Sequence, residues 1–437
     1  MHRLMILLVT WGLFVSACTG TTEESTVPTA TSSTAQTTTT TTLDVATSTV
    51  TETPSSTTTL ATPTTAPTTT TTTIAARPVT EDPNLPSAKG GHLVDWNLVG
   101  PRWTLALYDA GDMMMSTGTP TVLYLVDPEG TRYEVASWSS SARPYEILDW
   151  AGSGDSALLN RDGTEAVIVD LRTGAETGTV PLPFDYYGSP SSFTSPTGKN
   201  VVVLTDDGTT QRVERRTRSG SVLAVLGEQS TPTDVRRGLE WLYGYDGTFA
   251  LIKTASGIEL VDNDGTYVRD LWTPMGRTCT PVRWWTTDSF LASCLGDGSA
   301  FGHDFYSQLW ILETDGTAGD VLTAIPPGSI PVVDFGFVDA WRLPSQTIVQ
   351  WSGDCGAANV RELAADGSTT PLGGTSSHRF VEADASGMTI LAWQSCDGSE
   401  GWLYQADPSG NEVLELVPRV GDAWGVTDAA SLATVYP

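Results

Sequence analysis

Basic side chains are scarce in this chain of 437 residues. It has 23 Lys and Arg residues against 51 Asp and Glu residues, which gives a formal net charge of −28. Nucleic acids and anionic lipid headgroups are bound mainly through Lys and Arg, so we expect neither as a partner. The excess of carboxylates admits basic proteins or cations as partners, although an acidic surface also simply keeps an exported protein in solution.

The common signatures of catalysis are also missing. The sequence has no G-x-S-x-G turn, no phosphate-binding GxxxxGK[ST] loop, no dinucleotide-binding glycine pattern and no H-E-x-x-H motif. An EF-hand at Asp262 to Gly265 fails, because Leu260 and Leu271 would occupy ligand positions. We therefore expect a protein that is not an enzyme and has no cofactor. A hydrolase or lyase acting on glycans or peptides is the alternative, because the spatial separation of two catalytic carboxylates cannot be derived from sequence.

One long apolar run occurs, and it lies at the start of the chain. Met1-His2-Arg3 is basic, residues 4–15 are apolar, and Val15-Ser16-Ala17-Cys18 follows. This order predicts a secretory signal, and no later segment has the roughly 18 apolar residues of a membrane helix. The cysteine resembles the lipobox of bacterial lipoproteins. The resemblance implies that residues 1–17 are removed and that acylated Cys18 anchors the protein to the cell membrane on its extracytoplasmic side. An ordinary cleaved signal with an incidental Cys18 is the alternative.

Residues 18–77 have almost no aromatic or large aliphatic side chains. Thr dominates, with unbroken runs at Thr37 to Thr42 and Thr68 to Thr73. Such a segment cannot bury enough apolar surface to offset its ordering entropy, so we expect a disordered stalk. As a flexible coil of about 60 residues it would span roughly 45 Å. It would hold the rest of the chain, residues 88–437, away from the membrane.

Residues 88–437 repeat one pattern, in which an apolar strand meets a polar turn that ends in Gly and a second strand follows. The closing glycines recur about every 47 residues, at Gly130, Gly174, Gly220, Gly265, Gly316, Gly367 and Gly410. Gly supplies the positive φ of a tight hairpin. A second hairpin precedes each of these glycine turns, with examples at Ser195 to Gly198 and at Asp384 to Gly387. Seven four-stranded units of this kind predict an all-β, seven-bladed β-propeller.

The segment Phe193-Thr194-Ser195-Pro196-Thr197-Gly198-Lys199 resembles the S-P-D-G-K turn of TolB-like, WD40-like propellers, with Thr197 in place of the usual Asp. The resemblance supports the fold and implies no catalytic residue. An eight-bladed ring is the alternative, because residues 423–426 and 432–436 look like further strands. In the simpler interpretation this tail pairs with the first blade near Leu93 to Val99 and closes the ring.

Four further cysteines lie in the last three blades, and export favours disulfides between them. Of three connectivities, we prefer Cys279–Cys294, within blade five, and Cys355–Cys396, between blades six and seven. The sequence has no C-x-x-C, and no paired His, so the cysteines do not indicate a metal site.

Most loops that follow the second strand of a blade contain Asp, and these loops open on one side of a propeller. The residues that would ring one end of the channel are Asp109, Asp112, Asp162, Asp206, Asp207, Asp297, Asp304, Asp354 and Asp397. The longest of these loops, residues 295–307, adds His303, and long loops of mixed chemistry often bind ligands. We therefore take Asp297, His303, Asp304, Asp354 and Asp397 as candidate ligand-binding residues, with Ca²⁺ as the candidate ion. The competing explanation is that Asp-Gly is favourable hairpin chemistry.

These observations predict a membrane-tethered, extracytoplasmic propeller, monomeric, that acts as a binding or assembly module for an envelope protein or glycan. If the chain is instead a hydrolase or lyase, its site would centre on Asp297, His303 and Asp304.

Overall fold

The computed structural model describes residues 78–111, 119–139, 144–161, 163–182, 191–232, 238–296, 307–323, 334–353, 359–373, 377–384, 387–393 and 400–432. Within them it has one 3₁₀ helix, η1 (Gly91–Leu93), and is otherwise strands and turns. None of its helices could cross a bilayer in this part of the chain. The chain separates into Met1–Thr70 and Thr71–Pro437, and the described residues all belong to the second part.

Strands that follow one another in the chain pair into four-stranded antiparallel units. Unit 1 consists of β29 (Gly425–Ser431), β2 (Thr104–Asp109), β3 (Thr121–Val126) and β4 (Arg132–Trp138), with β1 (Lys89–Gly90) parallel to β4. Unit 2 consists of β5 (Pro144–Trp150), β6 (Ser156–Arg161), β7 (Glu165–Asp170) and β8 (Ala175–Pro181). Unit 3 consists of β9 (Ser191–Phe193), β10 (Asn200–Asp206), β11 (Thr210–Thr217) and β12 (Val222–Ser230). Unit 4 consists of β13 (Glu240–Tyr243), β14 (Phe249–Thr254), β15 (Gly257–Asp262) and β16 (Tyr267–Leu271).

The remaining strands form three further units of the same kind. Unit 5 consists of β17 (Arg277–Trp284), β18 (Ser289–Gly296), β19 (Ser307–Glu313) and β20 (Asp320–Val321). Unit 6 consists of β21 (Asp334–Arg342), β22 (Thr347–Gly353), β23 (Asn359–Leu363) and β24 (Thr369–Pro371). Unit 7 consists of β25 (Ser377–Asp384), β26 (Gly387–Trp393), β27 (Trp402–Ala406) and β28 (Glu412–Val417). One parallel pair, Ser307 with Gly336, joins units 5 and 6 into a single eight-stranded sheet.

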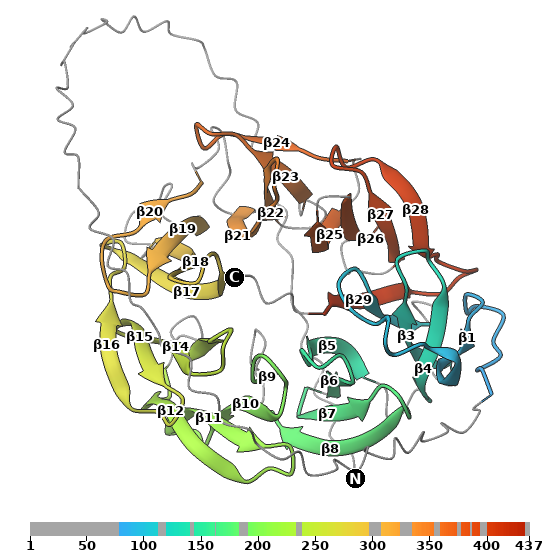
Figure 1. Cartoon of the computed structure of the whole chain (residues 1–437), viewed down its shortest axis with the longest axis horizontal. Coiled ribbons are helices and arrows are strands. Elements are labelled where there is room, and N and C mark those ends of the chain that lie inside the picture. The colour runs from blue at the N-terminus through green and yellow to red at the C-terminus, as the bar shows by residue number, and fades with distance from the viewer. Residues whose placement is uncertain are drawn as a thin grey trace, which may run out of the picture. The chain divides into compact units, whose positions relative to one another are not determined.

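The units surround a common centre, with the first strand of each unit inside and the fourth outside (Figure 1). The all-β propeller fold predicted from the sequence is confirmed. The blade number stays a prediction, because the strand pairing makes six sheets and the count of seven divides the eight-stranded sheet into two units.

The predicted glycine turns join the third and fourth strands. In unit 1, Asp127 Oδ1 accepts hydrogen bonds from the backbone N–H groups of Glu129 (3.1 Å) and Thr131 (2.7 Å), and Gly130 has φ +84°. Asp407 makes the same two contacts with Ser409 and Asn411 in unit 7. Because this chemistry involves only neighbouring residues, the sequence alone was enough to locate these turns.

The hydrophobic core consists of clusters between neighbouring units. Strand β2 is apolar on both faces because each face packs against a different unit. Leu105 and Leu107 pack towards unit 2, whereas Ala106 and Tyr108 pack towards unit 7. All six residues of β2 and of β3 are buried. The alternation predicted for these strands is therefore an alternation between two neighbouring sheets, as expected for strands buried on both faces.

The tail pairs with unit 1, but not with the segment that the sequence suggested. Strand β29 runs antiparallel to β2, with Leu105 opposite Ala430 and Leu107 opposite Asp428. Leu93 to Val99 is not extended, because η1 enters a turn in which Asp95 Oδ1 accepts a hydrogen bond from the Asn97 backbone N–H (3.1 Å).

The preferred Cys279–Cys294 disulfide is present and joins cross-strand partners of β17 and β18, with Cα atoms 4.0 Å apart. Cys18, Cys355 and Cys396 lie outside the described residues.

We expect Cys279→Ser to lower the free energy of unfolding, because a disulfide restricts the unfolded chain. For a loop of about 15 residues the loss is about 3 kcal/mol. Chemical denaturation of the variant and of the wild type, each with and without reductant, measures this, and reductant should have a smaller effect on the variant. Equal stability of the two oxidised proteins would contradict it.

Candidate functional site

The residues proposed from the sequence for ligand binding, Asp297, His303, Asp304, Asp354 and Asp397, lie outside the described residues, as do Asp112 and Asp162. Of the predicted acidic ring, Asp109, Asp206 and Asp207 are described. Asp109 and Asp206 are the last residues of two second strands, β2 and β10, and Asp207 follows β10 directly.

The carboxylates of Asp206 and Asp207 are engaged in local turn structure. Asp207 Oδ1 accepts hydrogen bonds from the Thr209 hydroxyl (2.6 Å) and from the backbone N–H groups of Thr209 and Thr210. These contacts, the Thr209 hydroxyl foremost, hold the pKa of Asp207 well below its ordinary value. Burial raises the pKa of Asp206, but hydrogen bonds led by the Thr231 hydroxyl (2.8 Å) lower it overall. At this turn the contacts favour the hairpin explanation over a ligand.

Across the described parts of the chain, no group of three or more His, Cys, Asp and Glu residues is arranged to hold a metal ion. Ca²⁺ binding by the acidic loops therefore stays a prediction.

A different set of charged residues emerges on the inner strands. Five of these strands contain a β-bulge that is followed directly by a charged residue: Asp149, Arg283, Asp339, Glu382 and Asp428. The three aspartates share a local contact, because each Oδ1 accepts a hydrogen bond from the next residue's backbone N–H at 2.8–2.9 Å. We call Asp149, Asp339 and Asp428 the bulge aspartates.

Asp428 connects three units. Its Oδ2 accepts a hydrogen bond from the Ile147 backbone N–H of unit 2 (2.6 Å), and its Oδ1 pairs with the Arg379 guanidinium of unit 7. The side chain of Asp428 is 6% exposed, whereas that of Arg379 is 41% exposed. Burial raises the pKa of nearby Glu146, and the charge of Asp428 adds to the effect. Two carboxyl groups and one guanidinium from three units therefore meet at the inner strands.

Asp339 connects units 5 and 6. Arg283 donates to both carboxylate oxygens, from Nε at 2.6 Å and from Nη2 at 2.5 Å. The same guanidinium lies over the Trp341 ring, 4.3 Å from its centroid. A carboxylate and an indole thus hold one cation between them, a combination of charge-assisted hydrogen bonding and cation–π attraction.

Asp149 connects units 2 and 3 without a cation. Its Oδ2 accepts a hydrogen bond from the Phe193 backbone N–H (2.7 Å), and no ion pair to it occurs among the described residues. Burial raises the pKa of Asp149 to about 6, and the hydrogen bonds from Phe193 and Trp150 lower it only in part.

This raised pKa makes stability depend on pH. An unfolded Asp loses its proton near pH 4, whereas folded Asp149 does so near pH 6. Below pH 4 the carboxyl group is protonated in both the folded and the unfolded state. Between pH 4 and 6 only the unfolded state ionises, so the free energy of unfolding falls as the pH rises. Above pH 6 both states are ionised and the loss stays constant. Asp149→Asn removes the ionisable group and with it this loss. The free energy of unfolding of the variant minus that of the wild type should therefore be about 1–3 kcal/mol larger at pH 7 than at pH 4. Denaturant titrations at both pH values measure this, and a pH-independent difference would contradict it.

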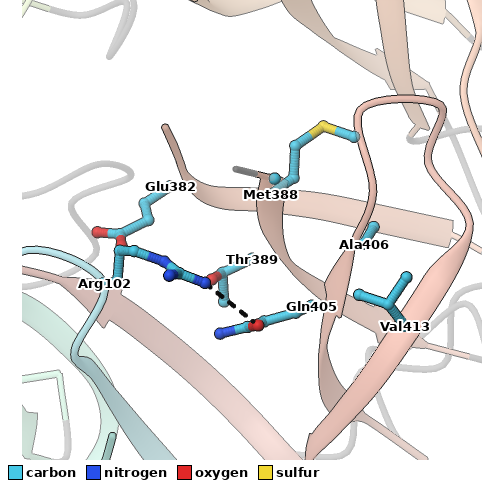
Figure 2. Close-up of a pocket in the computed structure, with 8 residues that line it drawn as sticks. Arg102, Glu382, Met388, Thr389, Gln405, Ala406 and Val413 are labelled. Atoms are coloured by element: carbon cyan, nitrogen blue, oxygen red, sulfur yellow. Dashed lines mark hydrogen bonds between the residues drawn. The ribbon is translucent and has the colours of Figure 1, made fainter. Parts of the chain in front are cut away.

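A small cavity lies where unit 7 meets the segment before β2. Figure 2 shows Arg102, Glu382, Thr389 and Gln405 around it, with Arg102 Nη2 donating to Gln405 Oε1 at 3.4 Å. Its volume of about 30 Å³ is sufficient for a water molecule and far below the roughly 300 Å³ of small-ligand pockets. This cavity therefore belongs to the packing of the two units.

No protein-family model matches the chain, and no curated protein sequence matches it. Among solved structures, it is similar to BamB from Moraxella catarrhalis, with 16% identity and a TM-score of 0.41 over 72% of this chain and 90% of that one. It is also similar to an oligogalacturonate lyase from Vibrio parahaemolyticus, with 13% identity and a TM-score of 0.40 over 61% and 79% of the chains. The Swd1 β-propeller domain of Myceliophteria thermophila is similar with 10% identity and a TM-score of 0.43 over 64% of this chain and 88% of that one. At these identities the similarities concern the fold alone.

Proposed function

We propose that the protein is a lipoprotein, anchored through Cys18 to the outer side of the bacterial cell membrane, whose propeller binds an envelope partner. The observation that carries the proposal is the order of its parts: a signal with a lipobox-like cysteine, a Thr-rich spacer at residues 18–77, and a propeller. A spacer between anchor and propeller is useful when the propeller must reach another molecule.

The outer strands support a protein partner. Val222 and Leu223 on β12 and Tyr267 and Val268 on β16 are 44–54% exposed. The two strands belong to neighbouring units, and the turn before β16 lies against β12, since a Cβ on Gly265 would be 2.0 Å from the Val225 carbonyl oxygen. We call these four side chains the rim patch. Exposed apolar side chains on two adjacent outer strands are typical of protein contact surfaces.

The anchor is tested by membrane fractionation of bacteria that express the full chain or Cys18→Ser. The wild type should sediment with membranes and enter a detergent phase, because two or three acyl chains anchor stably, whereas the variant should be released. A variant that stays with the membranes would disprove the anchor.

The binding role is tested by crosslinking the full chain in intact cells. The wild type should capture one envelope component reproducibly, and Leu223→Ser with Tyr267→Ser should reduce that capture severalfold. Lys199→Ser, a change away from the rim patch, serves as the control. If the wild type captures no protein or glycan, the binding role is wrong.

A further inference from the structure

A larger cavity borders Asp149 at the junction of units 2, 3 and 4. Its volume is about 180 Å³, and it is lined by the ends of β5, β9 and β13, including Asp149, Ser192, Phe193, Trp241 and Tyr243. This exceeds a single water molecule and falls below the roughly 300–1,000 Å³ of pockets for drug-sized ligands. The cavity therefore suits one small group or the end of one side chain.

No Arg or Lys among the described residues pairs with the carboxylate that lines this cavity, Asp149. The other two bulge aspartates are each paired with an arginine, Asp339 with Arg283 and Asp428 with Arg379. Within the described residues Asp149 has only backbone N–H partners, one on each oxygen. Each carboxylate oxygen can accept a further hydrogen bond, and a carboxylate partly removed from water is stabilised by a cation.

Trp241 supplies an aromatic group to the same cavity. Its Nε1 donates to Ser192 Oγ at 2.9 Å, which holds the indole in place and satisfies its one polar atom. The indole is half-buried, so part of it is accessible from the cavity. Trp is the aromatic side chain that attracts cations most strongly.

We propose that this cavity is a binding site for an organic ammonium group, such as the side-chain amine of a lysine. The chain itself provides the precedent, because Asp339 and Trp341 hold the Arg283 guanidinium with the same two kinds of group. At Asp149 the carboxylate and the indole are present, and no Arg or Lys of the described residues forms an ion pair with this carboxylate. The net charge of −28 would attract such ligands over a distance. The proposal is independent of the lipid anchor and of the rim patch.

The test is calorimetric titration of the detergent-solubilised full chain with Nα-acetyl-lysine methylamide. The norleucine analogue, which has the same stem without the ammonium group, is the matched control ligand. We expect a Kd of about 1 mM for the lysine compound and binding at least tenfold weaker for the norleucine compound.

Protein variants locate the site. Asp149→Asn should weaken binding of the lysine compound at least tenfold, and Trp241→Leu at least threefold, whereas Asp207→Asn, an exposed carboxylate in a turn, should leave it unchanged. If Asp149→Asn does not fold, Trp241→Leu and the two ligands on the wild type still decide the question.

Four outcomes would overturn the proposal. Equal binding of the two ligands would show an apolar pocket, and binding of methyl glucoside in their place would show a sugar site. No binding of the lysine compound, or an unchanged Kd in both cavity variants, would show that no cation site exists here.

Discussion

A chain that ends after Trp424 is expected to lose cooperative folding. The truncation removes β29, which supplies the inner strand of unit 1 and pairs with β2 along Thr104 to Asp109. It also removes Val426 and Ala429 from the cluster that packs unit 7 against unit 1. Without β29, the inner edge of β2 and the buried Tyr108 would be exposed to water. Because domains are stable by only about 5–15 kcal/mol, we expect the loss of a whole strand and its core contacts to be enough to unfold the chain.

Chemical denaturation followed by circular dichroism measures the effect, and the truncated chain should show no sharp transition. A synthetic peptide of residues 425–432, added in excess, should restore the transition, because it supplies the missing strand. A scrambled peptide of the same composition is the control. A truncated chain with the unfolding midpoint of the full chain would show that β29 is dispensable.

The turns could be predicted because their chemistry is local. Asp127, Gly130 and Thr131 are within four residues of one another, and their hydrogen bonds form whatever the rest of the chain does. The hairpins at Ser195 to Gly198 and at Asp384 to Gly387 are confirmed for the same reason. A recurrent local signal was enough to indicate the propeller.

The partner of the last strand could not be predicted in the same way. Leu105 and its partner Ala430 are more than 300 residues apart, and several apolar segments near residue 100 suit an edge strand equally well. Leu93 to Val99 was a wrong choice because Asp95 forms a turn there. Packing across the whole domain decides which apolar segment pairs with the last strand. The local sequence pattern does not contain that information.

The inner charged residues were not predicted, because Asp is disfavoured in strands and common in the loops where the sequence places the candidate site. A signal for them exists, since an Asp follows two aliphatic, aromatic or β-branched residues in each of three segments: Ile147-Leu148-Asp149, Phe337-Val338-Asp339 and Val426-Thr427-Asp428. The contacts that give these residues their roles are long-range. Asp428 contacts Ile147, 281 positions away. Only the structure shows that Asp339 and Asp428 each pair with an arginine, whereas Asp149 pairs with none of the described arginines.

Asp428→Ala is expected to lower the free energy of unfolding by about 4 kcal/mol. The substitution removes the carboxylate that pairs with Arg379 and leaves two backbone N–H groups, of Ile147 and Ala429, without their acceptor. Arg379 is 41% exposed and keeps its hydrogen bond to the Ala429 carbonyl (2.9 Å), so water can solvate its charge. Most of the loss comes from the two buried N–H groups, because each donor left without an acceptor costs about 1–3 kcal/mol. Asp428→Asn keeps one acceptor oxygen and should lose about half as much.

The control is Arg212→Ala, which breaks the pair of Arg212 with Glu228. These side chains are 33% and 55% exposed, with Nε and Oε2 2.6 Å apart, so the loss should be a small fraction of that caused by Asp428→Ala. Denaturant titrations of the three variants at pH 7 compare them directly. If Asp428→Ala costs no more than Arg212→Ala, the bulge aspartates do not hold the units together. If it costs several times more, Asp428 stabilises the junction of units 1, 2 and 7, because its carboxylate contacts Ile147 and Arg379.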